Sequence, residues 1–557
     1  MPTAFETHEV SNQSPPYVDV NLFTSDRALR EAVVREGGEA HAASLAAFGG
    51  RCGSAEAAER ARLANEMTPR LRTHDAKGRR LDRVEYHPAY HDLMRITIGH
   101  GLASMVWEHL LEPGTRPPAG INVARAAGTF LAAQMEPGHL CPVTMTHAAV
   151  PTLRRQPELA GTWLPRMLVR RYDPAFVPAD RKTGVTIGMG LTEKQGGTDV
   201  RANTTTAEPT SAPGPGREYV ITGHKWFMSA PMCDAFLVLA QAPGGLSCFL
   251  MPRFLPDGSA NGLRLQRLKD KLGNRSNASS EVEFQAARAW LVDEEGRGVP
   301  SIIEMVTETR LDCAVSSAGL MRLALANAIH HARHRSVAKR KLIDHALMAQ
   351  VLADMALDVE AATALVFRLA RAFDHADDPR AAAWRRLMTP VVKYWVCKMA
   401  PALICEAMEC LGGNGYVEEG VAARLYREAP LNAIWEGSGN VMALDLLRVL
   451  QREPEAATIV LEDLGSGLAG NARLKTGFER VQAMLHEPRL LDRRARALVE
   501  GLALVAAGVI LNASAPAAVA DTFIATRLSG PARGSYGQGI EGVDTRMIID
   551  RALPAAA

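Results

Sequence analysis

The chain has 557 residues, which is long enough for several domains of ordinary size and for a large buried core. Its 63 Lys and Arg residues face 61 Asp and Glu residues, and the net charge of +2 excludes an overall electrostatic attraction to nucleic acid or to a membrane. Any site that binds phosphates must therefore be a local cluster of bases.

The eight cysteines are scattered and include no CxxC pair. We expect reduced thiols, no zinc knuckle and no metal site. The first residues have neither the basic nor the apolar stretch of a signal peptide. The longest apolar run, Leu502 to Leu511, is about half the length that crosses a bilayer. The sequence predicts a soluble, cytoplasmic protein that does not enter a membrane.

The first part of the chain is predicted to be helical. Residues 1–40 form an N-terminal extension that starts polar and ends in a helix, which Ser25 or Asp26 can cap and which Gly37 and Gly38 terminate. Residues 41–182 show Ala- and Leu-rich helical periodicity with breaks at prolines. We therefore expect an all-helical domain there.

The pattern changes near residue 183. Residues 183–292 combine β-branched residues with glycines and predict a compact β domain. Helical periodicity returns over residues 293–450, with breaks expected at Pro379 and Pro390. Residues 451–557 form a further segment that starts helical. The predicted fold class is α+β.

The last segment contains a local basic cluster. It holds seven bases between Arg473 and Arg496 against three acids. Such a cluster can contact phosphates. A solvated or salt-bridged helix face is the alternative interpretation.

Two glycine-rich turns, at 412–415 and 436–440, flank a short helical run. Glycines allow backbone N–H groups to approach a ligand closely. A Glu436 that follows Ile434 and Trp435 would be partly desolvated, which raises a carboxyl pKa toward values useful for proton transfer. Two ordinary turns with a solvated Glu are the alternative. Neither a Rossmann fingerprint nor a phosphate-binding GKS/GKT loop is present, so a dinucleotide would need another architecture.

Several separated motifs resemble those of the acyl-CoA dehydrogenase family and occur in the same order. They are LTEKQGGTDV at 191–200, GHKWFMS at 223–229, LGNR at 272–275, SSEVEF at 279–284, GGNG at 412–415 and WEGSGN at 435–440. The resemblance covers residues 40–450. It implies a helical domain, a central β-barrel-like domain and a helical bundle, here with an extra C-terminal helical domain. It also implies FAD as cofactor and acyl-CoA as substrate.

The resemblance assigns roles to particular residues. Glu436 is the expected base that removes the α-proton of an acyl thioester, with Glu308 as a reserve candidate. Thr192 and Thr198 would bind the flavin, Phe227 would cover it and Ser229 would face its N5 atom. A buried aromatic strand is the alternative interpretation of Phe227. The full set of predicted flavin-binding residues is Leu191, Thr192, Gly197, Thr198, Phe227, Met228, Ser229, Arg335, Gly412, Gly413, Ile434, Trp435, Gly437, Ser438 and Asn440.

Arg335 matches a family arginine that reaches the flavin pyrophosphate of a neighbouring subunit. The sequence that follows it, SVAK at 336–339, departs from the family pattern. The resemblance therefore leaves open whether this contact is rearranged.

Both chain ends and the EKQGG variant are similar to one subgroup of the family, the DNA-alkylation-response flavoproteins. This similarity implies a homotetramer with weak dehydrogenase activity that binds double-stranded DNA through its C-terminal region. The residues expected to contact DNA are Arg448, Arg489, Arg493, Arg494 and Arg496. A metabolic FAD-dependent dehydrogenase of short or branched-chain acyl-CoA, with no DNA role, is the alternative.

Overall fold

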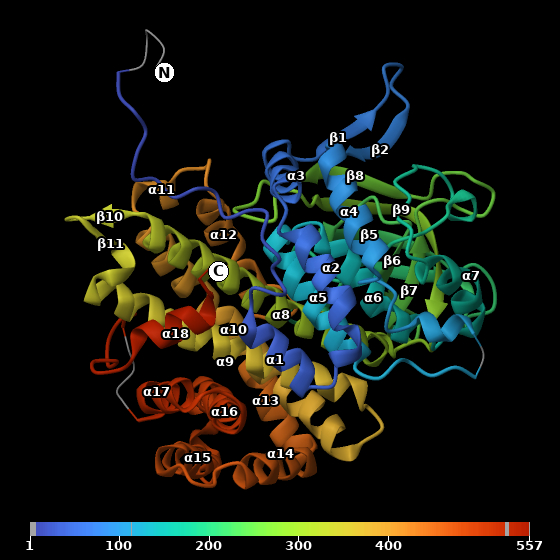
Figure 1. The fold of residues 1–557 in the computed structure, drawn as a ribbon. Helices are drawn as coiled ribbons and strands as arrows, with labels where there is room; N and C mark the ends of the chain where they lie inside the picture. Colours follow the sequence, from blue (N-terminus) through green and yellow to red (C-terminus); the bar gives the residue numbers. More distant parts are fainter. Residues whose placement is uncertain (1–6, 113, 530–533, 556–557) are drawn as a thin grey trace. The chain divides into compact units, whose positions relative to one another are not determined.

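The structure, a computed structural model, describes residues 7–112, 114–529 and 534–555 (Figure 1). The chain forms two compact units. One consists of residues 55–313, and the other combines residues 1–54 with residues 314–557. The boundary falls inside the long helix α8, Gly298–His334.

The unit of residues 55–313 contains a β barrel. Strands β4, β5, β9, β7 and β6 form a closed ring, since β6 pairs with both β7 and β4, while β3 adds to β6 and β8 adds to β9. Tyr219 and Ile221 alternate with more exposed residues on β5, and Phe236 and Phe249 are fully buried. The barrel confirms the predicted β-barrel-like fold. Its strands are β3 Ile187–Gly190, β4 Thr206–Pro209, β5 Glu218–Ser229, β6 Ala235–Ala242, β7 Gly245–Pro252, β8 Leu263–Leu268 and β9 Ser279–Val292.

Helices precede the barrel in the same unit, and α4 and α5 pack against α6. Their bounds are α3 Ala55–Glu66, α4 Pro88–His100, α5 Ile121–Met135, α6 Leu140–Leu153 and α7 Pro157–Met167. Helix α6 contacts β3, where the N–H of Ile187 donates to Oγ1 of Thr146 at 3.0 Å.

The expectation of an all-helical segment over residues 41–182 was wrong at one place. A hairpin of β1, Arg70–His74, and β2, Arg80–Glu85, interrupts the helices. Its turn is set locally, because the carboxylate of Asp75 accepts from the N–H groups of Lys77 and Arg79. Most of its side chains are polar and exposed, so it lacks the alternation of apolar and polar residues that would have marked it.

The other unit is almost entirely helical, and α9 and α10 pack together at its centre. Its helices are α1 Arg27–Arg35, α2 Ala42–Cys52, α9 Ala346–Asp374, α10 Pro379–Cys410, α11 Gly413–Tyr416, α12 Val421–Glu428, α13 Gly439–Arg452, α14 Pro454–Ser466, α15 Ala472–Leu485, α16 Leu491–Ser514, α17 Ala517–Leu528 and α18 Thr545–Ala552. A short hairpin of β10, Ser336–Val337, and β11, Arg340–Lys341, follows α8. Asp26, one of the two predicted caps, accepts from the N–H of Leu29 at the start of α1.

Helix α10 corrects the prediction at Pro390. Pro379 starts this helix behind the N-cap Asp378, as a first-turn proline can, but Pro390 lies inside it and does not end it. An interior proline removes one backbone hydrogen bond and costs about 3 kcal/mol. Met388, Val391 and Val392 beside it are fully buried, and we infer that their packing offsets this cost.

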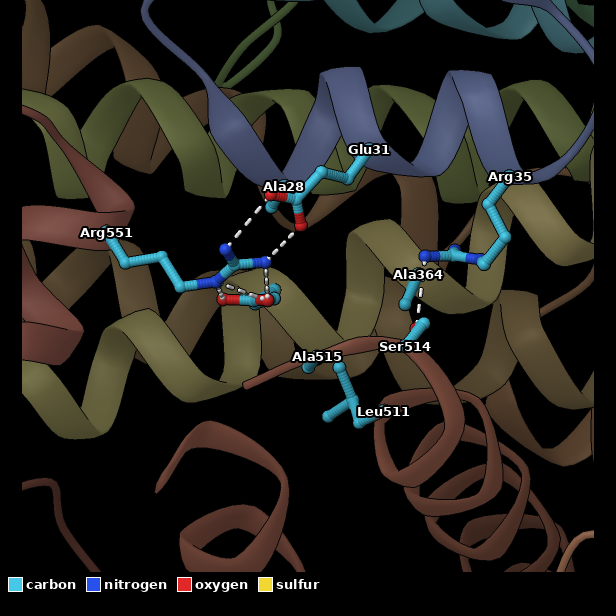
Figure 2. Close-up of a pocket in the computed structure, with 9 residues that line it drawn as sticks. Ala28, Glu31, Arg35, Ala364, Leu511, Ser514, Ala515 and Arg551 are labelled. Carbon is cyan, nitrogen blue, oxygen red and sulfur yellow. Dashed lines mark hydrogen bonds and ion pairs between the residues drawn. The ribbon is translucent and has the colours of Figure 1, made fainter. Parts of the chain in front are cut away.

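The residues after 450 are joined to the bundle by buried arginines. Arg527 of α17 pairs with Asp354 and Asp358 of α9 at 2.6 and 2.9 Å. Arg551 of α18 lies between Glu31 of α1 and Glu360 of α9, and Figure 2 shows its guanidinium directed at Glu31. The C-terminal extension is therefore an integrated part of this unit.

One helix in the described part of the chain is long and apolar enough to cross a membrane. It is the 24-residue helix α16, in which an 18-residue apolar window has a mean hydropathy of 1.8 and is 56% buried. A core helix passes the same test, so this finding is weak evidence for a membrane span. Seven of the eight cysteines are buried, and all eight are free thiols.

Candidate functional site

Glu436 occupies a strained turn just before α13. Its φ of 58° lies in the left-handed region, which is unfavourable for a residue with a side chain. Gly437 follows with φ 106°, and a Cβ there would lie 2.6 Å from Cε of Met442. The turn therefore requires glycine at 437, and it holds a half-buried carboxylate at 436.

Buried side chains anchor this turn. Nζ of Lys393, only 1% exposed on α10, donates to the carbonyl oxygen of Gly437 at 2.7 Å. Nε1 of Trp435 donates to Oδ1 of Asn432 at 2.9 Å, and Nδ2 of Asn432 donates to Oγ of Ser317 at 3.1 Å. Neighbouring helices thus fix the turn on both sides, while Ile434 is 63% exposed.

Gly412, Gly413, Ser438 and Asn440, four further predicted residues of this unit, lie exposed at or just before the starts of α11 and α13. Gly412 and Gly413 are exposed, and a Cβ on either would meet nothing within 4 Å, so their backbone is open to a ligand. Ser438 precedes α13, and Asn440 lies exposed in its first turn.

Arg335 is held by the N-terminal segment. Its Nη1 donates to the carbonyl oxygen of Asn12 at 2.8 Å, and the side chain of Asn12 also binds both backbone groups of Ser336. In the sequence SVAK, Ser336 and Val337 form strand β10. Ala338 and Lys339, both at positive φ, form the two-residue turn of the hairpin. The residues at 336–339, where the sequence departs from the family pattern, therefore belong to a tight β hairpin next to Arg335.

In the unit of residues 55–313, the predicted loop from Leu191 to Thr198 is supported from within the barrel. The carboxylate of Glu193, fully buried, accepts from Nζ of Lys225 at 2.7 Å and from the N–H groups of Thr204 and Thr205. Burial alone would raise the pKa of Glu193, but these hydrogen bonds outweigh it and hold the pKa well below its usual range. Burial lowers the pKa of Lys225 to about 8, against the opposing effect of Glu193.

The loop also contacts the GHKWFMS strand directly. The carbonyl oxygen of Thr192 accepts from the N–H of Trp226 at 2.9 Å. A Cβ on Gly197 would lie 2.5 Å from Oγ1 of Thr192. Any larger residue at 197 would therefore displace the Thr192 hydroxyl. Leu191 is half-buried, and Thr198 is exposed on the same loop.

A β-bulge sets the side-chain directions on β5. Its pairing with β9 shifts by one residue between Lys225 and Met228, and both of these side chains are buried. Trp226 and Phe227 between them are therefore both outside the core, and Phe227 is 51% exposed. The alternative of a buried aromatic pair is wrong. Lys269 lies 3.1 Å above the Trp226 ring and 4.7 Å from that of Phe227.

The predicted residues thus fall into two sets, one in each unit. Residues 191–198 contact the strand that carries residues 227–229 through Thr192 and Trp226. Residues 434–440 lie together at the start of α13 in the other unit, which also holds Arg335, Gly412 and Gly413. Their donors fit FAD, because hydroxyls and loop N–H groups can satisfy the flavin carbonyls and phosphates, and an exposed Phe227 offers a flat apolar face to the ring. The individual roles of these residues stay predictions.

Glu308, the reserve base, is part of a buried network. Nε1 of Trp107 donates to Nδ1 of His147 at 3.0 Å, which leaves the proton of a neutral His147 on Nε2, 3.4 Å from Oε2 of Glu308. Burial, aided by Arg125, lowers the pKa of His147 and keeps it neutral. Since Glu308 is engaged there and only 4% exposed, Glu436 stays the preferred base.

The residues that support the site were not predicted from the sequence. Lys225 and Lys393 are each only 1% exposed. Neither was predicted as a site residue, because a lysine is normally exposed. The signal for Lys225 was present: it lies inside the GHKWFMS motif. No cluster of three or more His, Cys, Asp or Glu that could bind a metal occurs among the described residues.

The predicted DNA-contacting arginines are solvent-exposed. Arg448 is on α13, Arg489 lies just before α16, and Arg493, Arg494 and Arg496 are in the first turns of α16. Arg494 pairs with Glu487 at 2.9 Å.

Arg496 connects this cluster to the bundle. Its Nε donates to the hydroxyl of Tyr394 at 3.0 Å, and its guanidinium lies 5.8 Å from the centre of that ring. The Tyr394 ring is 3.3 Å from the place a Cβ on Gly439 would take. The side chain of Tyr394 therefore contacts both Arg496 and the turn that carries Glu436.

Comparisons with known proteins agree with this fold. The adaptive response protein AidB N-terminal domain matches residues 12–174, the acyl-CoA dehydrogenase middle domain matches residues 188–287, and the acyl-CoA dehydrogenase C-terminal domain matches residues 296–451. The crystal structure of Caenorhabditis elegans ACDH-11 in complex with C11-CoA has a TM-score of 0.85 at 27% identity and covers 96% of this chain and 95% of its own.

The chain belongs to the acyl-CoA dehydrogenase family and is an FAD-dependent oxidoreductase of that type. Within the family it groups with AidB. It is 48% identical to AidB of Escherichia coli (strain K12) over 87% of this chain and 88% of that protein. Acyl-CoA dehydrogenase family member 11 of Caenorhabditis elegans is 31% identical over 87% of this chain and 79% of its own length.

Proposed function

We propose that this protein is an FAD-containing, acyl-CoA dehydrogenase-like protein of the DNA alkylation response that binds double-stranded DNA and retains weak dehydrogenase activity. The observation that carries the proposal is the contact of Arg496 with Tyr394, which places an exposed arginine cluster beside the turn of Glu436. The 48% identity to AidB supports the same assignment.

The dehydrogenase chemistry rests on Glu436. Bound FAD would accept a hydride from the β-carbon of an acyl thioester. Glu436 would remove the α-proton, and Lys393 and Asn432 would hold its turn in position. The ACDH-11 complex with C11-CoA supports acyl-CoA as the substrate class.

DNA binding rests on the exposed arginines at the start of α16. Arg489, Arg493 and Arg496 are exposed, and several arginines on one surface can replace counterions along a phosphate backbone. Other bases of the segment serve the fold instead: Arg480 donates to the carbonyl oxygen of Leu528 in α17.

The first experiment is an anaerobic visible spectrum of the purified flavoprotein during addition of acyl-CoAs that differ in length and branching. Slow bleaching of the flavin band that disappears in Glu436→Gln is the expected result. Rapid bleaching by one short or branched acyl-CoA, with no DNA binding, would instead establish the metabolic dehydrogenase. Bound flavin that no acyl-CoA bleaches would remove the dehydrogenase part of the proposal.

The second experiment measures binding of a fluorescent DNA duplex over a range of salt concentrations. We expect affinity to fall steeply with salt, by roughly one power of the salt concentration per phosphate neutralised. The variant Arg489→Gln/Arg493→Gln/Arg496→Gln should lower the slope by about three. Arg546→Gln, an exposed arginine of α18, is the matched control. A slope equal to that of the unchanged protein would contradict the proposed surface.

We also propose a cytoplasmic homotetramer. Apolar side chains are exposed around the glycine turns, among them Tyr416 at 77% and Ile434 at 63%, and such surfaces are typical of subunit contacts. Light scattering of the purified protein should give four times the 60.1 kDa chain mass, and fractionation of cells should place the protein in the cytoplasm. A monomer would contradict the tetramer.

A further inference from the structure

A chain of hydrogen bonds leads from Lys271 to Ser229. Nζ of Lys271 lies 2.9 Å from Oγ of Ser279, and this oxygen lies 3.2 Å from Oγ of Ser229. Ser279 and Ser229 are directly opposite each other in the pairing of β9 with β5, so the barrel backbone sets their spacing. Nζ of Lys271 also donates to the carbonyl oxygen of Asn277 at 2.7 Å, which holds the ammonium group in place.

The direction of these hydrogen bonds follows from the groups involved. An ammonium group has only donors, so Lys271 donates and Oγ of Ser279 accepts. Each serine has one hydroxyl hydrogen. N5 of an oxidised flavin accepts a hydrogen bond but cannot donate one. If Ser229 faces N5, its own hydrogen goes to N5, and the hydrogen between the serines comes from Ser279.

We propose that Lys271 acts through Ser279 to direct the Ser229 hydroxyl toward flavin N5 and thereby makes the bound flavin easier to reduce. The inference rests on the proposed placement of Ser229 at the flavin. A positive charge at the end of a hydroxyl chain polarises each bond along it, and the resulting stronger donor stabilises the electrons that arrive at N5. Lys271 is a positioning residue, since in this arrangement it acts on the flavin through Ser279 and Ser229.

Burial strengthens this effect. Ser279 is 5% exposed, and the neighbouring Ser280 is fully buried with its hydroxyl donating to the carbonyl oxygen of Met228. Hydrogen bonds and charges act more strongly where water is excluded. Glu281, the nearest carboxylate along β9, is paired with Lys269 and Arg267 at 2.6 and 2.7 Å.

The test is the reduction potential of bound FAD, measured by anaerobic titration against a reference dye. Lys271→Met and Ser279→Ala should each lower the equilibrium constant for reduction about tenfold, which is about 30 mV for two electrons. Ser279→Thr, which keeps the hydroxyl, should retain the potential of the unchanged protein. FAD content and thermal stability of each variant show that the holoprotein has been compared in a folded state.

A double variant separates the relay from a simple charge effect. If Lys271 acts through Ser279, Lys271→Met/Ser279→Ala should shift the potential no more than one of the single changes does. Arg267→Met removes another cation, 65% exposed on β8 and outside the relay, and should change the potential little. Additive shifts, or a Lys271→Met protein with an unchanged potential, would overturn the relay.

The variant Ser229→Ala distinguishes this inference from the proposed function. If Ser229→Ala lowers the potential and Lys271→Met does not, Ser229 faces the flavin and only the relay is wrong. If Ser229→Ala leaves the potential unchanged, Ser229 does not face N5, and both its placement and the relay are overturned.

Discussion

The ammonium group of Lys393 donates to the carbonyl oxygen of Gly437 at 2.7 Å and so ties the centre of α10 to the residue that follows Glu436. Lys393 is 1% exposed, and a buried lysine is unfavourable unless its donors are satisfied. The hydrogen bond therefore fixes the turn at a place where the Glu436 backbone is itself in an unfavourable conformation.

Replacing Lys393 by Met should loosen this turn. A hydrogen bond to a charged group contributes about 1.5–3 kcal/mol, so we expect a clear fall in thermal stability and at least a tenfold slower bleaching of the flavin by acyl-CoA. Lys398→Met, which removes an exposed lysine of the same helix, should leave thermal stability nearly unchanged. Equal stability of the two variants would show that the Lys393 contact does not hold the turn.

The ion pair of Glu193 and Lys225 supports the loop of residues 191–198 from inside the barrel. Breaking this pair should therefore weaken FAD binding indirectly, through the loop. Each single change, Glu193→Gln or Lys225→Met, leaves the other group buried in the barrel, at a cost of about 3–5 kcal/mol. The double variant leaves no unpaired charge. We therefore expect it to be more stable than either single variant in a thermal melt, while FAD affinity stays low in all three. Purely additive losses of stability would contradict this pairing.

Arg527 should be necessary for docking of the C-terminal extension. Arg527→Met would remove the buried ion pairs of Arg527 with Asp354 and Asp358, and breaking a buried pair costs about 3–5 kcal/mol. We expect a lower melting temperature and faster proteolysis of the extension. Arg546→Met removes an exposed pair with Asp550 and should cost at most about 1 kcal/mol. A similar effect of both changes would refute the anchoring role.

Stability should fall in mild acid because of His91. Burial, with a smaller effect of Arg95, lowers the pKa of His91 from 6.5 to about 4. Between these values the unfolded chain binds a proton that the folded protein does not, so the free energy of unfolding decreases as the pH falls from about 6.5 to 4.

Thermal melts across this pH range provide the measurement. His91→Gln cannot titrate but can keep the hydrogen bond to the hydroxyl of Tyr172, and it should show a shallower decline. Burial also lowers the pKa of His100 to about 4, so part of the decline should persist. His375→Gln, at an exposed position, is the control. An equally steep decline in His91→Gln would exclude His91 as a cause.

The overall architecture was predictable because the relevant patterns are local. Helical periodicity and the switch to β-branched residues each depend on neighbouring residues, and the barrel and bundle agree with them. The β1–β2 hairpin and the continuous α10 were missed for one reason. In both, the apolar periodicity does not carry the deciding feature: the hairpin turn depends on polar hydrogen bonds around Asp75, and the helix continues through Pro390 among fully buried neighbours.

The site was predictable only in part. The sequence by itself determined the family, the cofactor and the candidate base Glu436, because motifs keep their order and spacing along the chain. Only the tertiary structure decided that Lys225 and Lys393 are buried supports, that Trp226 and Phe227 both leave the barrel core, and that Lys271 reaches Ser229 through Ser279. Burial and hydrogen-bond partners depend on segments far apart in the chain, and hydrophobic periodicity does not encode them.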